Sequence, residues 1–265
     1  LQRARIQIKS VRSTMLEPGY GYLRVTQFQG QSGIETQKAL AKLIDQEELN
    51  GLVLDLRNNP GGVLTAAVQI ADLFLDDGLI VYTQGRAEES RTNYAATKGD
   101  MLDGLPIVVL VNAGSASASE IVAGALQDQE RAIIIGHTTF GKGSVQTIMP
   151  LHHERALKLT TARYYTPNGR SIQAEGIVPD IRTEVARVEL ASDDGYVREA
   201  DLRGHLENNT TKDKAAATAG EAPLVSRDYA LYEALSILKG VHLAARRDAP
   251  RNTPNNPPSK KANAQ

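Results

Sequence analysis

The sequence predicts an α/β fold in which repeated β–α units build a buried sheet, extended by antiparallel strands and followed by a C-terminal helix. Two copies of one pattern predict the sheet. Residues 52–56 (LVLDL) are a short apolar run that leads through the turn cluster 58–62 (NNPGG) into the helix-like segment 64–74. The same order returns where residues 107–111 (IVVLV) run through an Asn-Ala-Gly turn into the helical stretch 119–126.

The remaining elements follow in chain order. Residues 3–12 alternate apolar and charged side chains, as a half-buried strand does, and 20–28 reads similarly after the turn at Pro18-Gly19. Apolar positions recur at helical spacing over 34–44, which predicts a first crossover helix. Beyond Arg131 the pattern becomes strand-like, which predicts an antiparallel extension over 132–136, 144–151 and 156–166.

The chain divides into one main domain and three smaller parts. We expect a catalytic core over residues 1–204 and a polar linker over 205–225, which has little to bury. An amphipathic helix is predicted over 226–247, where its apolar stripe could pack on the core or on another subunit. Residues 248–265 contain four prolines and almost no large apolar residue, and we expect them to be disordered.

Composition excludes several classes of function. The net charge of −1 provides no global field for nucleic acid or an anionic membrane. The absence of cysteine removes disulfides, thiolate metal sites and cysteine nucleophiles. No apolar run approaches the roughly 20 residues that span a bilayer, and we expect no metal and no cofactor. The start, Leu1-Gln2-Arg3, is neither an initiator Met nor a signal peptide, so we interpret it as an internal cut in a longer precursor.

Two short segments carry residues suited to nucleophilic catalysis. The run Gly114–Glu120 (GSASASE) lies between a predicted strand and a predicted helix, where a side chain is held rigidly beside the first helical N–H groups. Taken alone, it fits better a tight turn in which Ser117 or Ser119 caps the helix. The second segment places Lys142 between two glycines, which allow the backbone to approach another segment closely. A serine needs a base to take its proton, and a lysine can serve as one where desolvation lowers its pKa.

These segments resemble peptidase family S41, the carboxyl-terminal processing or tail-specific serine peptidases. The likeness rests on four motifs in order: LVLDLRNNPGG, GSASASEIVAGALQD, TTFGKGSVQ and RYYTPNGRSIQAEGIVPDI. The resemblance implies that Ser117 is the nucleophile, that Lys142 is the general base and that Gln146 orients Lys142. It also implies an oxyanion hole made by the backbone N–H of Ala118 and that of Gly61 or Gly62, without deciding between the two glycines.

Other polar residues are predicted to have structural roles. We expect Asp55 and Arg57 to be framework residues and Glu120 to offset the dipole at the helix start. Asp72 is predicted to lie on a helix face, apart from Asp55. A His-based triad through His137 is not favoured, since no Asp partner is indicated. His152 and His153 are predicted to lie near a strand end, without a catalytic role.

The resemblance further implies a ClpP/crotonase-like core that cleaves protein or peptide substrates through an acyl-enzyme. It implies an extracytoplasmic, typically periplasmic, location and a PDZ domain preceding the core. A homo-oligomer and a regulatory adaptor are partners that it admits. Two alternatives stay open: a noncatalytic peptide- or lipid-binding module on the same scaffold, and a crotonase-type acyl-CoA enzyme, which needs no Ser–Lys pair.

Overall fold

A six-stranded sheet forms the centre of the molecule. The computed structural model describes residues 9–151, 155–184, 186, 188–189, 199, 202–204, 206 and 223–248. The strand order is β1-β2-β3-β6-β7-β10. The strands are β1 (Val11–Glu17), β2 (Tyr20–Val25), β3 (Gly51–Asp55), β6 (Ile107–Val111), β7 (Ile133–Gly136) and β10 (Ile181–Arg182). All neighbours pair in parallel except β1 and β2, which form a hairpin.

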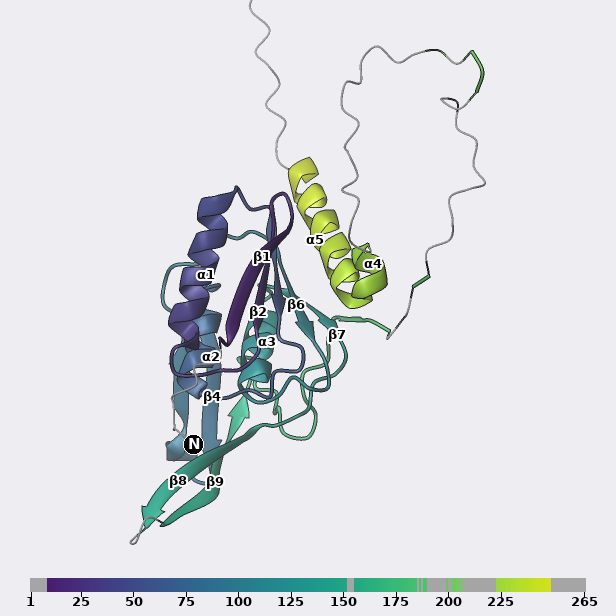
Figure 1. Cartoon of the computed structure of the whole chain (residues 1–265). Helices are drawn as coiled ribbons and strands as arrows, with labels where there is room; N and C mark the ends of the chain where they lie inside the picture. Colours follow the sequence, from purple (N-terminus) through teal and green to yellow (C-terminus); the bar gives the residue numbers. More distant parts are fainter. Residues whose placement is uncertain are drawn as a thin grey trace, which may run out of the picture.

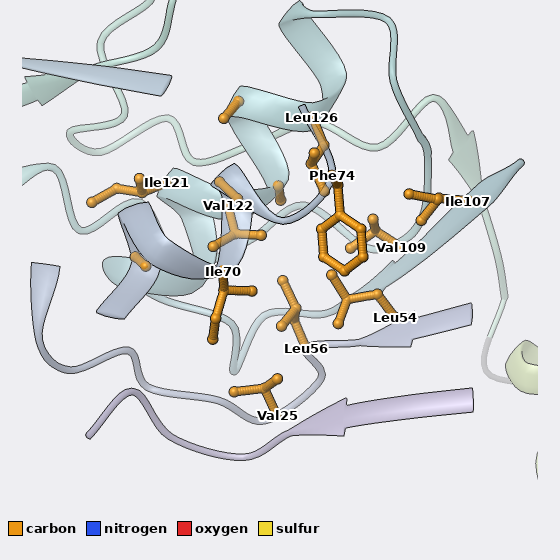
Figure 2. Close-up of a cluster of buried hydrophobic side chains, with 14 of the residues drawn as sticks. Val25, Leu54, Leu56, Ile70, Phe74, Ile107, Val109, Ile121, Val122 and Leu126 are labelled. Atoms are coloured by element: carbon orange, nitrogen blue, oxygen red, sulfur yellow. The ribbon is translucent and has the colours of Figure 1, made fainter. Parts of the chain in front are cut away.

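Three helices cover one face of this sheet: α1 (Ser32–Gln46), α2 (Leu64–Asp72) and α3 (Ala118–Asp128). Because side chains alternate across a strand, Leu54 and Val109 point to this face and pack with Phe74, Ile70 and residues of α3, as Figure 2 shows. The strands β3 and β6 are buried along their whole length, as expected for parallel strands covered on both sides.

The opposite face is covered by the C-terminal helix α5 (Tyr229–Asp248), which Figure 1 shows in yellow beside the sheet. Val53, Val108 and Leu110 point to this side and contact Leu235 and Leu238. Helix α5 follows a one-turn helix, α4 (Leu224–Arg227), from which it is separated at Asp228. The prediction of one continuous helix over 226–247 is therefore corrected to two helices with a break at residue 228.

A second sheet is antiparallel, with the order β5-β4-β9-β8. Its strands are β4 (Leu79–Gly85), β5 (Thr92–Ala95), β8 (Ser144–Leu151) and β9 (Arg155–Tyr165), and a short 3₁₀ helix η1 (Glu88–Ser90) joins β4 to β5. The far halves of β8 and β9 project from the body as a two-stranded ribbon (Figure 1). The antiparallel extension predicted from the sequence is present for 144–151 and 156–166, with β4 and β5 as additional strands, but the predicted strand 132–136 is corrected: as β7 it pairs in parallel with β6 in the central sheet.

The first predicted strand is shifted. Residues 1–8 lie outside the described residues, and the strand β1 begins at Val11, so that most of it follows the predicted range 3–12. The reason is the hairpin: Glu17 pairs with Tyr20 across the Pro18-Gly19 turn, and this turn fixes which residues face β2. The predicted polar linker and the C-terminal tail after residue 248 lie almost wholly outside the described residues. Within the described part of the chain, none of the helices is both long and apolar enough to cross a membrane.

Candidate active site

Ser117 lies in a tight turn between the end of β6 and the start of α3. Its backbone has φ 56° and ψ −109°, a left-handed conformation that a residue with a Cβ adopts at a cost of about 1–3 kcal/mol. Such strain between a strand and a helix is the geometry that presents a nucleophile. Ser117 is also the N-cap residue of α3, so it holds the capping position as well.

Hydrogen bonds hold this turn against the segment that follows β3. The Ser115 hydroxyl donates to the carbonyl of Leu56 at 2.8 Å. The carbonyl of Asn59 accepts two bonds of 2.9 Å, from the Ala116 N–H and from the Ser119 hydroxyl. The hydroxyl groups of Ser115 and Ser119 thus fasten the turn to the segment after β3, which explains the hydroxyl residues on both sides of Ser117.

The glycine loop after β3 touches the nucleophile turn at Gly61. Gly61 has φ 94°, and a Cβ placed on it would lie 2.8 Å from the Cβ of Ser117 and 2.9 Å from the nitrogen of Ala118. Only glycine permits this approach. The structure therefore brings together Gly61, Ser117 and Ala118, three residues singled out from the sequence.

The two candidate glycine donors differ in their bonding. The Gly61 N–H donates to Oδ1 of the buried Asn59 at 2.9 Å. No acceptor for the Gly62 N–H is found among the described residues. The N–H of Ala118, the first residue of α3, falls outside the i to i−4 bonding pattern of the helix.

Glu120, fully buried on the first turn of α3, joins the serine turn to the lysine loop. Its Oε2 accepts from the backbone N–H of Ser117 at 2.7 Å and from that of Lys142 at 2.9 Å. Its Oε1 accepts from the Thr139 hydroxyl and from the Gly141 N–H, both at 2.6 Å. Because one oxygen binds both, the backbone nitrogens of Ser117 and Lys142 are no farther apart than these two bonds laid end to end.

Glu120 therefore does more than offset the helix dipole, which was the role expected from the sequence. It does lie at the helix start, where a carboxylate offsets the dipole, but four neutral donors surround it and three of them belong to the lysine loop. Its position three residues after Ser117 is the spacing of a capping box, a signal that points to the bond with the Ser117 N–H. The bonds to the lysine loop have no counterpart in the local sequence pattern.

A second segment, residues 172–177, packs against the lysine loop from its other side. A Cβ on Gly143 would lie 2.4 Å from the nitrogen of Gln173, and one on Gly141 would lie 3.1 Å from the carbonyl carbon of Ala174. The Ala174 N–H donates to the carbonyl of Gly141 at 2.9 Å. The glycines on both sides of Lys142 thus serve close backbone contact, as their pattern predicts. Lys142 itself is half-buried.

No hydrogen bond between described residues joins Gln146, His137 or Asp72 to this cluster. Gln146 is exposed and is the third residue of β8, where the pairing with β9 shifts by one residue between Val145 and Gln146. His137 lines a cavity of about 300 Å³ on the α5 side of the sheet. Asp72 accepts hydrogen bonds from the backbone and side chain of Thr97, well separated in its bonding from Asp55. His152 and His153 lie outside the described residues.

Asp55 is the centre of a buried polar network at the end of β3. Its side chain accepts from the Tyr22 hydroxyl at 2.7 Å, from Arg24 at 2.9 Å and from the Arg57 guanidinium at 2.6 and 3.0 Å. Burial and the charge of Asp55 raise the pKa of Tyr22. Burial alone would lower the pKa of Arg57, but its hydrogen bonds to Asp228 and Asp55 raise it above the ordinary arginine value.

Over the ranges that the structure describes, no group of three or more His, Asp or Glu side chains is arranged to hold a metal ion. The four groups around Glu120 are donors of hydrogen bonds, which suit a carboxylate rather than a cation.

Comparison with known proteins identifies relatives of this chain. Residues 19–183 match the model of "Peptidase family S41". The chain is 47% identical over 242 residues to a carboxy-terminal-processing protease of Bartonella bacilliformis, an alignment that covers 89% of this chain and 55% of the relative. It is 43% identical over 171 residues to a carboxyl-terminal-processing protease of Synechocystis sp., covering 64% of this chain and 39% of that one.

A solved structure supports the same relationship. The photosystem II D1 C-terminal processing protease superposes with a TM-score of 0.61 at 37% identity, over 69% of this chain and 50% of that chain. This match confirms the mixed α/β architecture. The chain spans about half the length of the Bartonella relative.

Proposed function

Because this chain belongs to peptidase family S41, we propose that it is a carboxyl-terminal processing serine endopeptidase that cleaves protein substrates through Ser117 and Lys142. One observation carries the proposal furthest. A single carboxylate oxygen, Oε2 of Glu120, binds the main chain of both residues and so fixes the serine turn and the lysine loop side by side.

In the proposed first step, the Ser117 hydroxyl attacks the carbonyl carbon of the scissile peptide bond. The neutral amine of Lys142 accepts the hydroxyl proton as the new C–O bond forms. When the tetrahedral intermediate collapses, the C–N bond breaks and Lys142 returns the proton to the leaving amine. A water molecule, activated by the same amine, then hydrolyses the acyl-enzyme. We assign Gln146 the task of orienting Lys142.

The negative charge that develops on the carbonyl oxygen would be stabilised by two backbone donors. Ala118 is one, since its N–H begins α3 and is not used by the helix. For the second we favour Gly62 over Gly61, because the Gly61 N–H already donates to Asn59. Preformed donors of this kind contribute about 3–4 kcal/mol each to the stabilisation of the transition state.

Cleavage of casein by a set of variants tests the proposal. We expect Ser117→Ala and Lys142→Ala each to lower the rate by at least about a thousandfold. Lys142→Arg places at this position a guanidinium that cannot be deprotonated to accept the Ser117 proton, so it should be as inactive as Lys142→Ala. Lys42→Ala, at an exposed position on α1, is the matched control and should cleave at the wild-type rate.

Three outcomes separate the candidate functions. Equal rates in wild type, Ser117→Ala and Lys142→Ala would exclude the dyad. Binding of casein by the wild type without cleavage would favour a noncatalytic peptide-binding module. Hydrolysis of an acyl-CoA thioester that survives Ser117→Ala would favour a crotonase-type enzyme. We also propose an extracytoplasmic location, on the strength of the family relationship alone, which fractionation of cells expressing the complete gene product would test.

A further inference from the structure

The C-terminal helix α5 is joined to the active-site region by a paired ion bridge. The Nη1 and Nη2 atoms of Arg57 each donate to one carboxylate oxygen of Asp228 at 2.8 Å, a bidentate arrangement. Arg57 lies two residues beyond the end of β3, and Asp228 directly precedes α5. The Arg57 side chain is 15% exposed and that of Asp228 31%, so the pair is largely withdrawn from water.

Asp228 also fixes the start of α5. Its Oδ1 accepts from the N–H of Leu231 at 3.1 Å, and its carbonyl accepts from the N–H of Tyr232 at 3.0 Å. These are the bonds of a helix N-cap. One residue therefore determines both where α5 begins and which part of the core its first turn contacts.

On the other side, Arg57 lies within the segment that supports the nucleophile turn. Leu56, its predecessor, accepts the bond from the Ser115 hydroxyl. Asn58, its successor, donates its N–H to the side chain of Asn112 at 2.9 Å. Asn59 then accepts the bonds from Ala116 and Ser119. Arg57 therefore lies in a main-chain segment that contacts the connection between β6 and α3 at its three neighbours Leu56, Asn58 and Asn59.

The guanidinium of Arg57 depends for its position on Asp228 as well as on Asp55. Asp55 is shared with Arg24 and Tyr22, whose bonds of 2.9 and 2.7 Å both reach its Oδ2. The outer edge of the guanidinium, Nη1, has its bond to Asp228. Without the Asp228 carboxylate, the largely buried guanidinium of Arg57 would keep only half of its hydrogen bonds to carboxylates. Leaving a buried charge without its partner costs far more than losing an exposed ion pair.

We propose that Asp228 is a positioning residue for the active site: through Arg57, docking of the C-terminal helix sets the segment Leu56–Gly62 and with it the oxyanion loop. The inference rests on the proposed peptidase function. It makes the α4–α5 region a component of the catalytic apparatus, in addition to a cover for the sheet. Departure of the first turn of α5 lowers the turnover rate without removing any residue that touches the substrate.

The chain offers a matched control in the middle of the same helix. Lys239 of α5 forms an ion pair with Glu17 at the end of β1, far from the glycine loop in the sheet order. Lys239→Gln therefore removes an ion pair between α5 and the sheet, as Asp228→Asn does, but leaves Arg57 untouched. Asn is as good an N-cap residue as Asp, so Asp228→Asn isolates the ion pair from the cap.

The test uses hydrogen exchange and steady-state kinetics on the whole chain. We expect Asp228→Asn to accelerate amide exchange over residues 57–63, and to lower kcat on a fluorogenic peptide about tenfold with KM changed less than about twofold. Lys239→Gln should leave both readouts as in wild type. Asp228→Glu, which restores the carboxylate, should recover part of kcat and also serves if the Asn variant folds poorly.

The exchange measurement does not depend on the chemistry of the site. If residues 57–63 exchange equally in wild type, Asp228→Asn and Lys239→Gln, the inference is wrong whatever the activities are. Equal losses of kcat in Asp228→Asn and Lys239→Gln would likewise overturn it, since helix docking in general would then be responsible. Failure of the proposed function is recognised separately, by a Ser117→Ala variant that retains the wild-type rate.

Discussion

Thr139 and Glu120 lie nineteen residues apart in the chain and are joined inside the core by a hydrogen bond of 2.6 Å. The bond is one of four that end on the same buried carboxylate, and each of the four donors lies in the serine turn or in the lysine loop. The geometry of the candidate site therefore depends on a side chain that need not contact substrate at all.

Replacement of this carboxylate should damage both stability and activity. In Glu120→Gln, the amide nitrogen faces N–H and O–H donors that it cannot accept from, so at least one buried donor loses its partner. We expect the free energy of unfolding to fall by about 2–3 kcal/mol, which is the cost of an unpaired buried polar group. Casein cleavage should fall at least tenfold. Urea unfolding and the casein assay measure the two effects.

The control is Glu175→Gln, since Glu175 is exposed in the segment beside the lysine loop. It should resemble wild type in both measurements. A stable, fully active Glu120→Gln variant would show that the lysine loop is held by its contacts with residues 172–177 alone.

Gly61→Ala should reduce stability and activity by more than the cost of a positive φ angle alone. The new methyl group would lie 2.5 Å from the Ala116 carbonyl oxygen and 2.9 Å from the nitrogen of Ala118, the proposed oxyanion donor. Gly104→Ala is the matched control, because Gly104 has φ 77° and no atom within 4 Å of the added Cβ. It should lose about 1 kcal/mol of stability and no activity, whereas Gly61→Ala should lose more stability and nearly all casein cleavage.

Equal stability losses in the two alanine variants, with activity kept in both, would contradict the close approach of the glycine loop to the serine turn. Differential scanning fluorimetry and the casein assay suffice for the comparison.

The ion pair of α5 should give the stability a defined dependence on pH. Burial alone would raise the pKa of Asp228, but its hydrogen bonds with Arg57 and the charge of Arg57 lower it below the ordinary value of 3.8. A carboxyl group with a lowered folded-state pKa stabilises the fold above its unfolded pKa and ceases to do so as the pH falls through the folded pKa. Wild type should therefore exceed Asp228→Asn in free energy of unfolding between about pH 5 and 7, and the difference should shrink below about pH 4.

Urea unfolding of both proteins at a series of pH values measures this difference. A gap that stays constant down to pH about 3 would mean that the Asp228 charge contributes nothing and that the variant acts through packing.

Docking of α5 on the sheet should depend on its buried apolar face. Leu238 is fully buried, and a Cβ on Gly51 of β3 would lie 2.8 Å from its Cδ1. Leu238→Ala should lower the free energy of unfolding by about 2–5 kcal/mol, because the cavity cannot close completely. Leu243→Ala, at a position that is 53% exposed on the same helix, should change it by less than about 0.5 kcal/mol. Similar values for the two variants in urea unfolding would argue against this packing.

The central sheet and the positions of the two catalytic motifs could be predicted from the sequence because their signals are local. The runs 52–56 and 107–111 are apolar throughout, and each is followed by a turn cluster and a helical pattern, so both β–α units are found where expected. The glycines around Lys142 likewise predict a close backbone contact, and Gln173 and Ala174 make it.

The features that the sequence did not reveal depend on partners distant in the chain. Strand β5 (TNYA) is short and mostly exposed, and β4 gains its place by pairing with β9 far downstream. The bond between Arg57 and Asp228 spans 171 positions, and no local pattern marks either residue as its partner. Glu120 carries a local signal for one of its four bonds, to Ser117, and none for the three that reach the lysine loop.

The contact between Ala174 and Gly141 has a consequence for biosynthesis. A ribosome releases the lysine loop before the segment that braces it, so this loop cannot reach its final packing until Ala174 has also been synthesised.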